Sequence, residues 1–135
     1  MANLYSQFTY DESLKLKATA AATSSAAGSI IVDLGEGLTD AYMVIDVSAL
    51  DVASTDEIYN IYLEGSNVAA MDSGSVALAQ IEMGNATAPA DADTSTGRFV
   101  VPFRNEQNGT LYRYVRVYTK VAGTTPTITY SAFIG

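Results

Sequence analysis

The sequence predicts an all-β fold, and three observations carry that prediction. Apolar residues make up 48% of the 135 residues and charged residues 16%, a balance typical of one folded domain rather than a disordered chain. From residue 65 onward, glycines recur at intervals of nine to fourteen residues, which is the spacing of turns between short strands. Between these turns apolar and polar residues alternate, as they do in strands that bury one face.

The first half of the chain contains four expected strands. They cover residues 15–20, 29–34, 42–48 and 58–64. In the third of them Met43, Ile45 and Val47 share one face, and Asp46 lies on the other. The alanine-rich stretch 18–28 has no charged face and no large apolar stripe, so it predicts a strand end that continues into a loop rather than a helix.

Four further strands are expected in the second half. They cover residues 76–83, 97–104, 111–121 and 127–134. Pro102 cannot donate to a strand ladder, which places its strand at a sheet edge or beside a bulge. Asn108 and Gly109 tolerate a positive φ and separate two alternating runs, so they predict a hairpin. Residues 84–97 are small and polar and form the longest expected loop.

Eight antiparallel strands in a chain of this length predict a two-sheet jelly roll. We expect a single domain over residues 14–135, an eight-stranded antiparallel jelly-roll sandwich. Residues 1–13 precede it as a short N-terminal arm that contains Tyr5 and Phe8. Such an arm either packs on a partner or folds back on its own core.

The absence of His and Cys excludes several classes of chemistry. Ser-His-Asp hydrolases need an imidazole base, most zinc and iron sites need His or Cys ligands, and redox pairs and disulfides need Cys. The N-terminus has no basic segment followed by an apolar one, so we expect no secretory signal and a location in the cytoplasm or in a particle assembled there.

The net charge of −8 argues against a direct nucleic-acid binder, which must neutralise phosphates. The charges are also unevenly distributed. Residues 18–97 carry twelve acids and no base, whereas residues 98–135 carry five bases and one acid. This segregation predicts a dipolar molecule whose basic segment contacts an acidic surface, although acidic loops that serve only solubility are an equal alternative.

Carboxylates offer the only candidate catalytic groups, since Asp46, Glu64 and Glu82 all fall on outward strand faces. A small sandwich rarely has room for the apolar cleft that raises a catalytic pKa. Residues 91–97 place oxygen ligands at alternate positions, but Pro102 stands where a calcium loop needs its closing Glu. We therefore expect no enzymatic activity, no metal and no cofactor.

The strand expected at 111–121 carries the strongest functional pattern, because phenols and cations alternate along its outward face. These residues are Tyr112, Tyr114, Arg116, Tyr118 and Lys120. Tyr and Arg are enriched in protein interfaces because they offer broad contact area and a polar tip. The pattern predicts a contact surface, which Arg98 and Arg104 are expected to extend. Tyr5 and Phe8 of the arm are expected to contribute as well.

Two alternatives exist for these tyrosines. Tyr has a high β propensity and pairs well across strands, so the pattern also suits a purely structural role. The same rings could stack on sugars, as in a carbohydrate-binding or receptor-binding module.

Three segments carry a resemblance to a known family. They are FTYDESLKLKATA at 8–20, SIIVDLG at 29–35 and YRYVRVY at 112–118. In order and spacing they resemble the jelly-roll capsid cement, or decoration, proteins of tailed bacteriophages.

The resemblance implies a virion structural protein on the outer surface of the capsid, assembled in the host cytoplasm. Such a protein binds the phage major capsid protein and bridges neighbouring subunits. The resemblance also implies a homo-oligomer, a dimer or a trimer, with no membrane contact. A carbohydrate-binding or receptor-binding virion module is the alternative function.

Overall fold

The computed structural model describes residues 10–84 and 94–135. A 3-10 turn, Glu12–Leu14, precedes the first strand and is capped by the Asp11 side chain. The strands are β1 (Lys15–Ala22), β2 (Ala26–Ala27), β3 (Val32–Asp33), β4 (Asp40–Leu50), β5 (Ile58–Ser66), β6 (Val76–Gly84), β7 (Gly97–Arg104), β8 (Glu106–Gln107), β9 (Thr110–Leu111), β10 (Tyr114–Ala122) and β11 (Ile128–Ile134).

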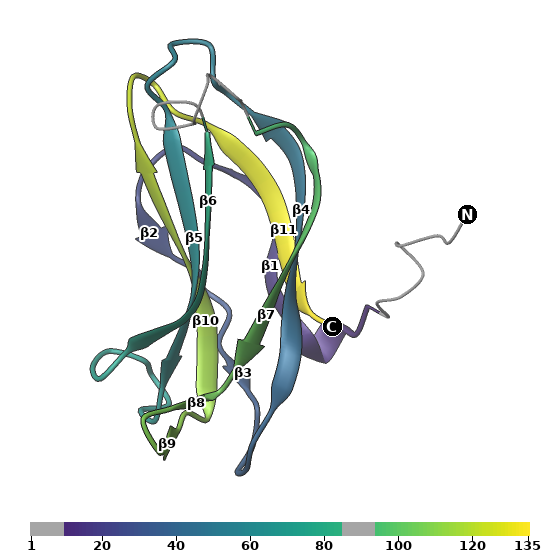
Figure 1. The fold of residues 1–135 in the computed structure, drawn as a ribbon, viewed down its shortest axis with the longest axis vertical. Helices are drawn as coiled ribbons and strands as arrows, with labels where there is room; N and C mark the ends of the chain where they lie inside the picture. The colour runs from purple at the N-terminus through teal and green to yellow at the C-terminus, as the bar shows by residue number, and fades with distance from the viewer. Residues whose placement is uncertain (1–9, 85–93) are drawn as a thin grey trace.

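The strands form two layers that face each other (Figure 1). One layer, sheet A, has the strand order β1-β11-β4-β7. The other, sheet B, has the order β2-β10-β5-β6, and β3 also pairs with β10. The pair β8 and β9 forms a separate hairpin at the lower end in Figure 1. Every pairing is antiparallel, so the predicted all-β class and antiparallel arrangement are confirmed.

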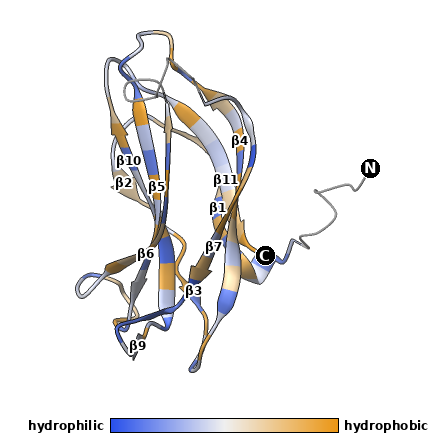
Figure 2. Cartoon of the chain, viewed as in Figure 1, coloured by the Kyte–Doolittle hydropathy of each residue, from blue (hydrophilic) through white to orange (hydrophobic). Residues whose placement is uncertain are grey.

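The core lies between the sheets and is built by the inward residues of each strand. In β10, for example, Val115 and Val117 are fully buried, while Tyr114 and Arg116 alternate with them on the outside. The largest fully buried apolar side chains are Tyr59, Tyr130, Leu16, Met43, Ile45, Ile61, Leu63, Met71 and Ile128. Figure 2 shows the resulting mixture of hydrophobic and hydrophilic residues along single strands. This alternation explains how a chain of modest hydropathy fills one continuous core.

One buried hydroxyl pair crosses the core. Tyr130 of β11 and Thr119 of β10 hydrogen-bond to each other, and both side chains are buried. Burial raises the pKa of Tyr130 to about 12, because the phenolate would lose its hydration. The pair thus ties the two sheets together without leaving either hydroxyl unsatisfied.

The described residues form eleven strands, several of them only two residues long, so the predicted count of eight is not confirmed. The strand expected at 29–34 is replaced by β2 and β3, two short pieces that pair with different parts of β10. Between them the chain passes close over β10, where the Gly28 N–H donates to the Val117 carbonyl at 2.8 Å. A Cβ at Gly28 would lie 2.9 Å from the Val117 side chain, so this approach requires glycine.

The strand expected at 111–121 is also interrupted. Tyr112 and Arg113 separate β9 from β10, because their backbone groups bond outside the ladder. The Tyr112 N–H donates to the Asn105 carbonyl, and the Arg113 N–H donates to the Asn67 side chain. The chain therefore changes direction at these two residues, and the outward face predicted for the whole segment begins only at Tyr114.

Pro102 lies in β7, which is an edge strand of sheet A, as predicted. Its cross-strand partner is Tyr42. Both backbone groups of Tyr42 bond to Gly135 on the other side, so Tyr42 and Pro102 form a non-hydrogen-bonded pair. The nitrogen of Pro102 consequently faces the open edge, where the proline removes a donor that another strand could use.

The predicted hairpin at Asn108 and Gly109 is confirmed. Glu106 pairs with Leu111 and Gln107 pairs with Thr110. Asn108 has a φ of 53° and Gly109 a φ of 83°, the positive values that a two-residue hairpin turn of this type requires.

The upper end in Figure 1 is closed by a tight approach of two loops. The buried carboxylate of Glu57 accepts bonds from the backbone of Ser54 and Asp56. Gly123, with a φ of 108°, lies over this loop, and a Cβ there would be 2.5 Å from the Asp56 carbonyl oxygen. No helix in the described part of the chain is long and apolar enough to cross a membrane.

Candidate functional site

The outer side of sheet B carries the residues that the sequence pattern singled out. Tyr114, Arg116, Tyr118 and Lys120 of β10 lie on this face, because they alternate with the buried residues of the same strand. Tyr62 of the neighbouring strand β5 lies beside Tyr118, its cross-strand partner, with ring centroids 6.5 Å apart in an edge-on arrangement. We call these five residues the tyrosine face.

The charges of the tyrosine face are largely balanced within the sheet. Arg116 lies opposite Glu64 of β5, and its Nε donates to the Glu64 carboxylate at 3.0 Å. Both side chains are only 21% exposed. The predicted cation is therefore presented as one half of an ion pair, whereas Lys120 is exposed at the end of the strand. The face is thus aromatic and polar rather than strongly basic.

Amide side chains border the tyrosine face on its β6 side. Gln80 lies opposite Tyr62, and its amide donates to the Asn60 oxygen at 3.3 Å. Asn60 is also the cross-strand partner of Lys120. Aromatic rings, amides and hydroxyls therefore adjoin one another over β10, β5 and β6.

Arg98 and Arg104 lie on the other layer of the sandwich. They belong to β7, and their side chains pair with Asp46 and Asp40 of the adjacent strand β4 at 2.6 and 2.8 Å. One flat surface cannot include both them and the tyrosine face, so the predicted set of contact residues is divided between two opposite sides. The reason is that β7 and β10 belong to different sheets.

Tyr112 also lies apart from the tyrosine face. Gly65 is the cross-strand partner of Val115, whose side chain points into the core, so a Cβ added to Gly65 would also point inward. That Cβ would lie 3.0 Å from the Cβ of Tyr112. Tyr112 therefore approaches the inner side of sheet B at the lower end of the sandwich. Tyr5 and Phe8 lie outside the described residues. Tyr10, which follows them, places its ring edge-on against Phe133 with centroids 5.4 Å apart.

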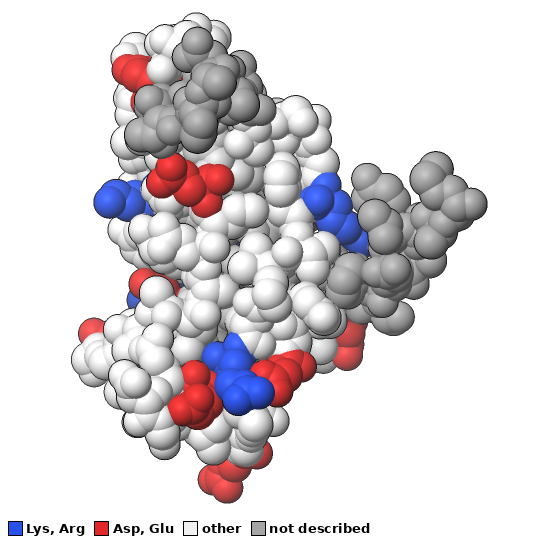
Figure 3. Space-filling model, in the orientation of Figure 1, with Lys and Arg blue, Asp and Glu red and all other residues white. Residues whose placement is uncertain are grey.

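The predicted separation of charge does not survive folding. The basic C-terminal segment and the acidic central segment form neighbouring strands, so β7 pairs with β4 and β10 pairs with β5. All four arginines are paired with carboxylates that lie 52 to 80 residues earlier in the chain. Figure 3 accordingly shows acidic and basic atoms adjoining each other at the lower end of the molecule. The prediction of a dipolar molecule with a free basic face is therefore wrong.

The three carboxylates considered for catalysis do not form a pair. Asp46 lies on the outer side of sheet A, whereas Glu64 and Glu82 lie on the outer side of sheet B. Glu82 lies opposite Asn60, four residues from Glu64, which separates them by about 13 Å along the strand. That exceeds the separation of roughly 9.5 Å at most found in inverting glycosidases.

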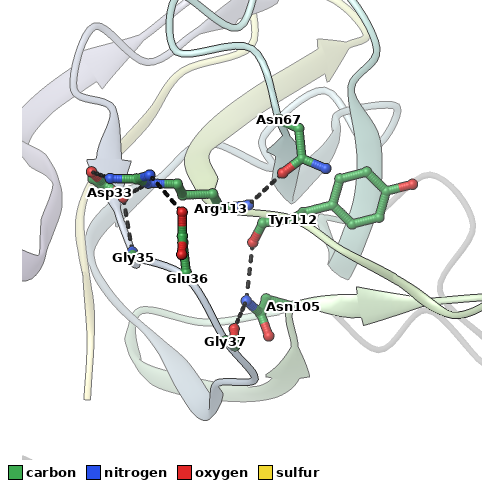
Figure 4. Close-up of polar contacts among 8 residues, drawn as sticks. All are labelled: Asp33, Gly35, Glu36, Gly37, Asn67, Asn105, Tyr112 and Arg113. Atoms are coloured by element: carbon green, nitrogen blue, oxygen red, sulfur yellow. Dashed lines mark hydrogen bonds and ion pairs between the residues drawn. The ribbon is translucent and has the colours of Figure 1, made fainter.

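A second cluster of polar contacts lies at the lower end of the sandwich, where three connections meet (Figure 4). The connections are residues 34–39, the β5–β6 loop 67–75 and the hairpin region 105–113, and we call them together the loop end. The centre is Asn105, which is fully buried. Its amide donates to the carbonyls of Gly37 and Tyr112, both at 3.0 Å, and its oxygen accepts from the Thr39 N–H at 2.7 Å.

Arg113 binds the same connections from outside. Its guanidinium makes a two-pronged pair with Asp33 at 2.8 and 2.9 Å and lies 3.8 Å from Glu36. The bond from Arg113 holds the pKa of Asp33 below its usual range, and the Gly35 N–H adds to this effect. Asn67 links the β5–β6 loop to the hairpin, because its amide donates to the Leu111 carbonyl at 2.8 Å. The three connections are therefore fixed to one another.

No group of three or more acidic side chains placed to hold a metal ion occurs in residues 10–84 and 94–135. Residues 91–93 of the weak calcium-like segment at 91–97 lie outside those residues.

Several residues of these sites were missed by sequence reasoning. Tyr62 could have been found, because the alternation of β5 places it on the face of Asn60 and Glu64. Asn105 and Arg113 had no such pattern, since their roles depend on partners up to 80 residues away. No family model matches the chain, and no curated protein matches it.

Proposed function

We propose that this chain is a capsid cement protein of a tailed bacteriophage, which binds the outer surface of the phage head and stabilises contacts between major capsid subunits. The observation that carries the proposal is the tyrosine face: half-buried phenol rings and an internally neutralised Arg116–Glu64 pair on the outer side of sheet B. Such a face buries area against a protein surface, and Arg116 enters the contact already paired with Glu64. The resemblance of segments 8–20, 29–35 and 112–118 to the cement family points the same way.

The finer fold assignment is part of this proposal. If β2 and β3 are counted as one broken strand and the β8–β9 hairpin is set aside, eight strands remain. Sheet A then contains the first, eighth, third and sixth strands in order, and sheet B the second, seventh, fourth and fifth. Two four-stranded sheets with this exchange of strands support an eight-stranded jelly roll.

A cement protein works through many modest contacts rather than one strong site. An interface of standard size, roughly 1,600 Å² in total, matches what one face of a small sandwich can offer. Copies repeated over a symmetric shell strengthen a weak contact through effective concentration. We propose that the protein acts as a homo-oligomer, a dimer or a trimer, after assembly in the host cytoplasm. The proposed role involves no catalysis, cofactor, membrane or direct nucleic-acid contact.

The test uses expanded heads of the phage that encodes the chain, prepared without this protein. Purified protein is expected to bind them saturably, and Tyr114→Ala with Arg116→Ala is expected to weaken binding at least tenfold. The matched control is Tyr42→Ala with Arg98→Ala, which removes the same residue types from the outer side of sheet A. Unchanged occupancy of the first variant would remove the tyrosine face from the proposal, and no binding by the wild-type protein would end it.

A carbohydrate-binding or receptor-binding virion module is the second candidate. It is favoured by the edge-on pair of Tyr62 and Tyr118, next to the amides of Asn60 and Gln80, because rings and amides together suit sugar recognition. A glycan array separates the two functions. Selective saccharide binding with no affinity for shells would favour this candidate.

A further inference from the structure

The loop end exposes large apolar side chains on all three of its connections. Leu38 is 56% exposed, Leu111 41% and Val68 39%. The loops at the opposite end, 51–57 and 123–127, expose no large apolar side chain. Figure 2 shows hydrophobic colour at the tip of the β3–β4 connection, where the chain turns at the bottom of the molecule. Among the described residues, three of the seven exposed large apolar side chains therefore lie at the loop end, one on each of its connections.

These side chains project from backbone that is held in place. The Asn105 side chain joins the hairpin region to the β3–β4 connection through hydrogen bonds with Thr39 and Gly37, and its third bond, to the Tyr112 carbonyl, lies within the hairpin region. Figure 4 shows the bonds to Gly37 and Tyr112. A further pair of backbone bonds links Asn105 to Thr39 and Tyr112. Asn67 joins the hairpin region to the β5–β6 loop through bonds to Leu111 and Arg113. The backbone that carries the exposed leucines is therefore held by hydrogen bonds between the three connections.

The β5–β6 loop is anchored by its own contacts as well. Met71 is 99% buried and adopts a φ of 50°, which turns the loop inward. The Met71 N–H donates to the Val68 carbonyl, and the Ser66 hydroxyl donates to the Ser73 carbonyl. Burial of Met71 leaves Val68 outside at the surface of the same turn.

A fixed frame that keeps apolar side chains in water is the arrangement expected of a docking surface. Ordering of loops costs conformational entropy, and a surface ordered before binding avoids that cost when the partner arrives. Clustered exposed apolar side chains with a polar border mark interaction sites on soluble proteins. The loop end has both properties, namely an ordered backbone and exposed apolar side chains with a polar border.

The border of the loop end is acidic. Together with the residues that directly flank it, the loop end covers 33–40, 67–75 and 104–113, which contain five acids and two bases, a net charge of −3. The two bases, Arg104 and Arg113, are paired with Asp40 and Asp33, so they offer little free positive charge. The Glu36 side chain is 92% exposed. A partner that suits this end therefore has an apolar patch bordered by lysine or arginine side chains.

We infer that the loop end is a second docking surface, which inserts Leu38 and Leu111 into an apolar patch with a basic border on a shell subunit. This inference rests on the proposed function. A protein that bridges neighbouring subunits needs two separate contact surfaces, and the loop end is formed by connections between strands rather than by the outer side of sheet B, which carries the tyrosine face.

The test compares Leu38→Ser with Leu111→Ser against the control Val100→Ser on the same expanded heads. Val100 is 39% exposed and lies within β7, opposite Val44 of β4. It therefore resembles Leu111 in exposure but lies outside the loop end. The double variant is expected to lose at least tenfold in affinity with an unchanged melting temperature, and the control is expected to bind like the wild type. Glu36→Lys is expected to weaken binding several-fold at low salt and to have a smaller effect at high salt.

The outcomes separate this inference from the proposed function. Wild-type protein that fails to bind shells refutes the proposed function. Binding that Tyr114→Ala with Arg116→Ala weakens but the leucine double variant leaves unchanged refutes only the loop-end surface. A solution oligomer that the leucine double variant dissociates would identify a second copy of the chain as the occupant and would also overturn the inference.

Discussion

Replacement of Asn105 tests whether the loop end is fixed by the contacts described above. Asn105→Ala removes three side-chain hydrogen bonds, to Thr39, Gly37 and Tyr112, from a fully buried position. At about 1 kcal/mol for each bond, the free energy of unfolding is expected to fall by about 3 kcal/mol. That is a large part of the 5–15 kcal/mol typical of a domain.

Asn105→Asp gives a sharper result because it changes one atom. The new carboxylate still accepts from Thr39, but it faces the carbonyls of Gly37 and Tyr112, to which it can no longer donate. At pH 7 the loss is expected to reach about 5 kcal/mol, since a buried charge meets two acceptors. The pKa of this carboxyl is raised in the folded state, so protonation favours folding. The deficit relative to wild type is therefore expected to shrink as the pH falls through that raised value toward about 4.

Urea unfolding at pH 7, and at intervals down to pH 4, measures these effects from the midpoint and slope of each transition. Asn67→Ala is the matched control. It also removes side-chain bonds to two backbone groups, but Asn67 is exposed and water can replace them, so a loss of about 1 kcal/mol is expected. Asn105→Ala within about 0.5 kcal/mol of wild type would refute the reasoning, as would equal losses for the two asparagines.

Three further predictions concern the sandwich itself. The raised pKa of Tyr130 means that the unfolded chain ionises near pH 10 while the folded phenol stays neutral until about pH 12, so roughly 3 kcal/mol of stability is lost over that window. Tyr130→Phe is expected to remove this loss of stability at alkaline pH, and to cost about 1 kcal/mol at pH 7 because Thr119 is left unpaired. Denaturant titration measures both effects, and an equal dependence of stability on pH in the two proteins between pH 10 and 12 would contradict the prediction. Gly123→Ala is expected to cost about 3 kcal/mol, because a Cβ meets the Asp56 carbonyl at a positive φ, and a normal melting temperature would argue against that contact. Pro102→Val is expected to restore a backbone N–H donor at the open edge of β7 and so to cause concentration-dependent association, measured by light scattering. A strictly monodisperse variant would show that the proline does not protect this edge from pairing.

The sheet arrangement explains why the arginines clustered in the C-terminal segment do not form a basic surface. Antiparallel pairing places Asp46 opposite Arg98 and Glu64 opposite Arg116, and the ladder holds each pair at bonding distance. Cross-strand pairs of opposite charge contribute up to about 1 kcal/mol each and help to define the register. The arginines of the C-terminal segment are consequently presented as halves of ion pairs rather than as free cations.

Local patterns were sufficient to predict several features. Alternation along β10 predicted that Tyr114, Arg116, Tyr118 and Lys120 share an outward face, because the side chains of any strand alternate between its two sides. Pro102 predicted a sheet edge, and Asn108 with Gly109 predicted a hairpin, since both follow from the backbone chemistry of single residues.

Only the tertiary structure decided which strands lie side by side. The division of Arg98 and Arg104 from the tyrosine face, the interruption at Tyr112, and the frame around Asn105 all depend on contacts between distant segments. Periodicity assigns a residue to one side of its own strand, but the strand order and register come from long-range pairing and the packing of a shared core. The sequence therefore determined which side chains point outward, and the folded arrangement determined which of them meet.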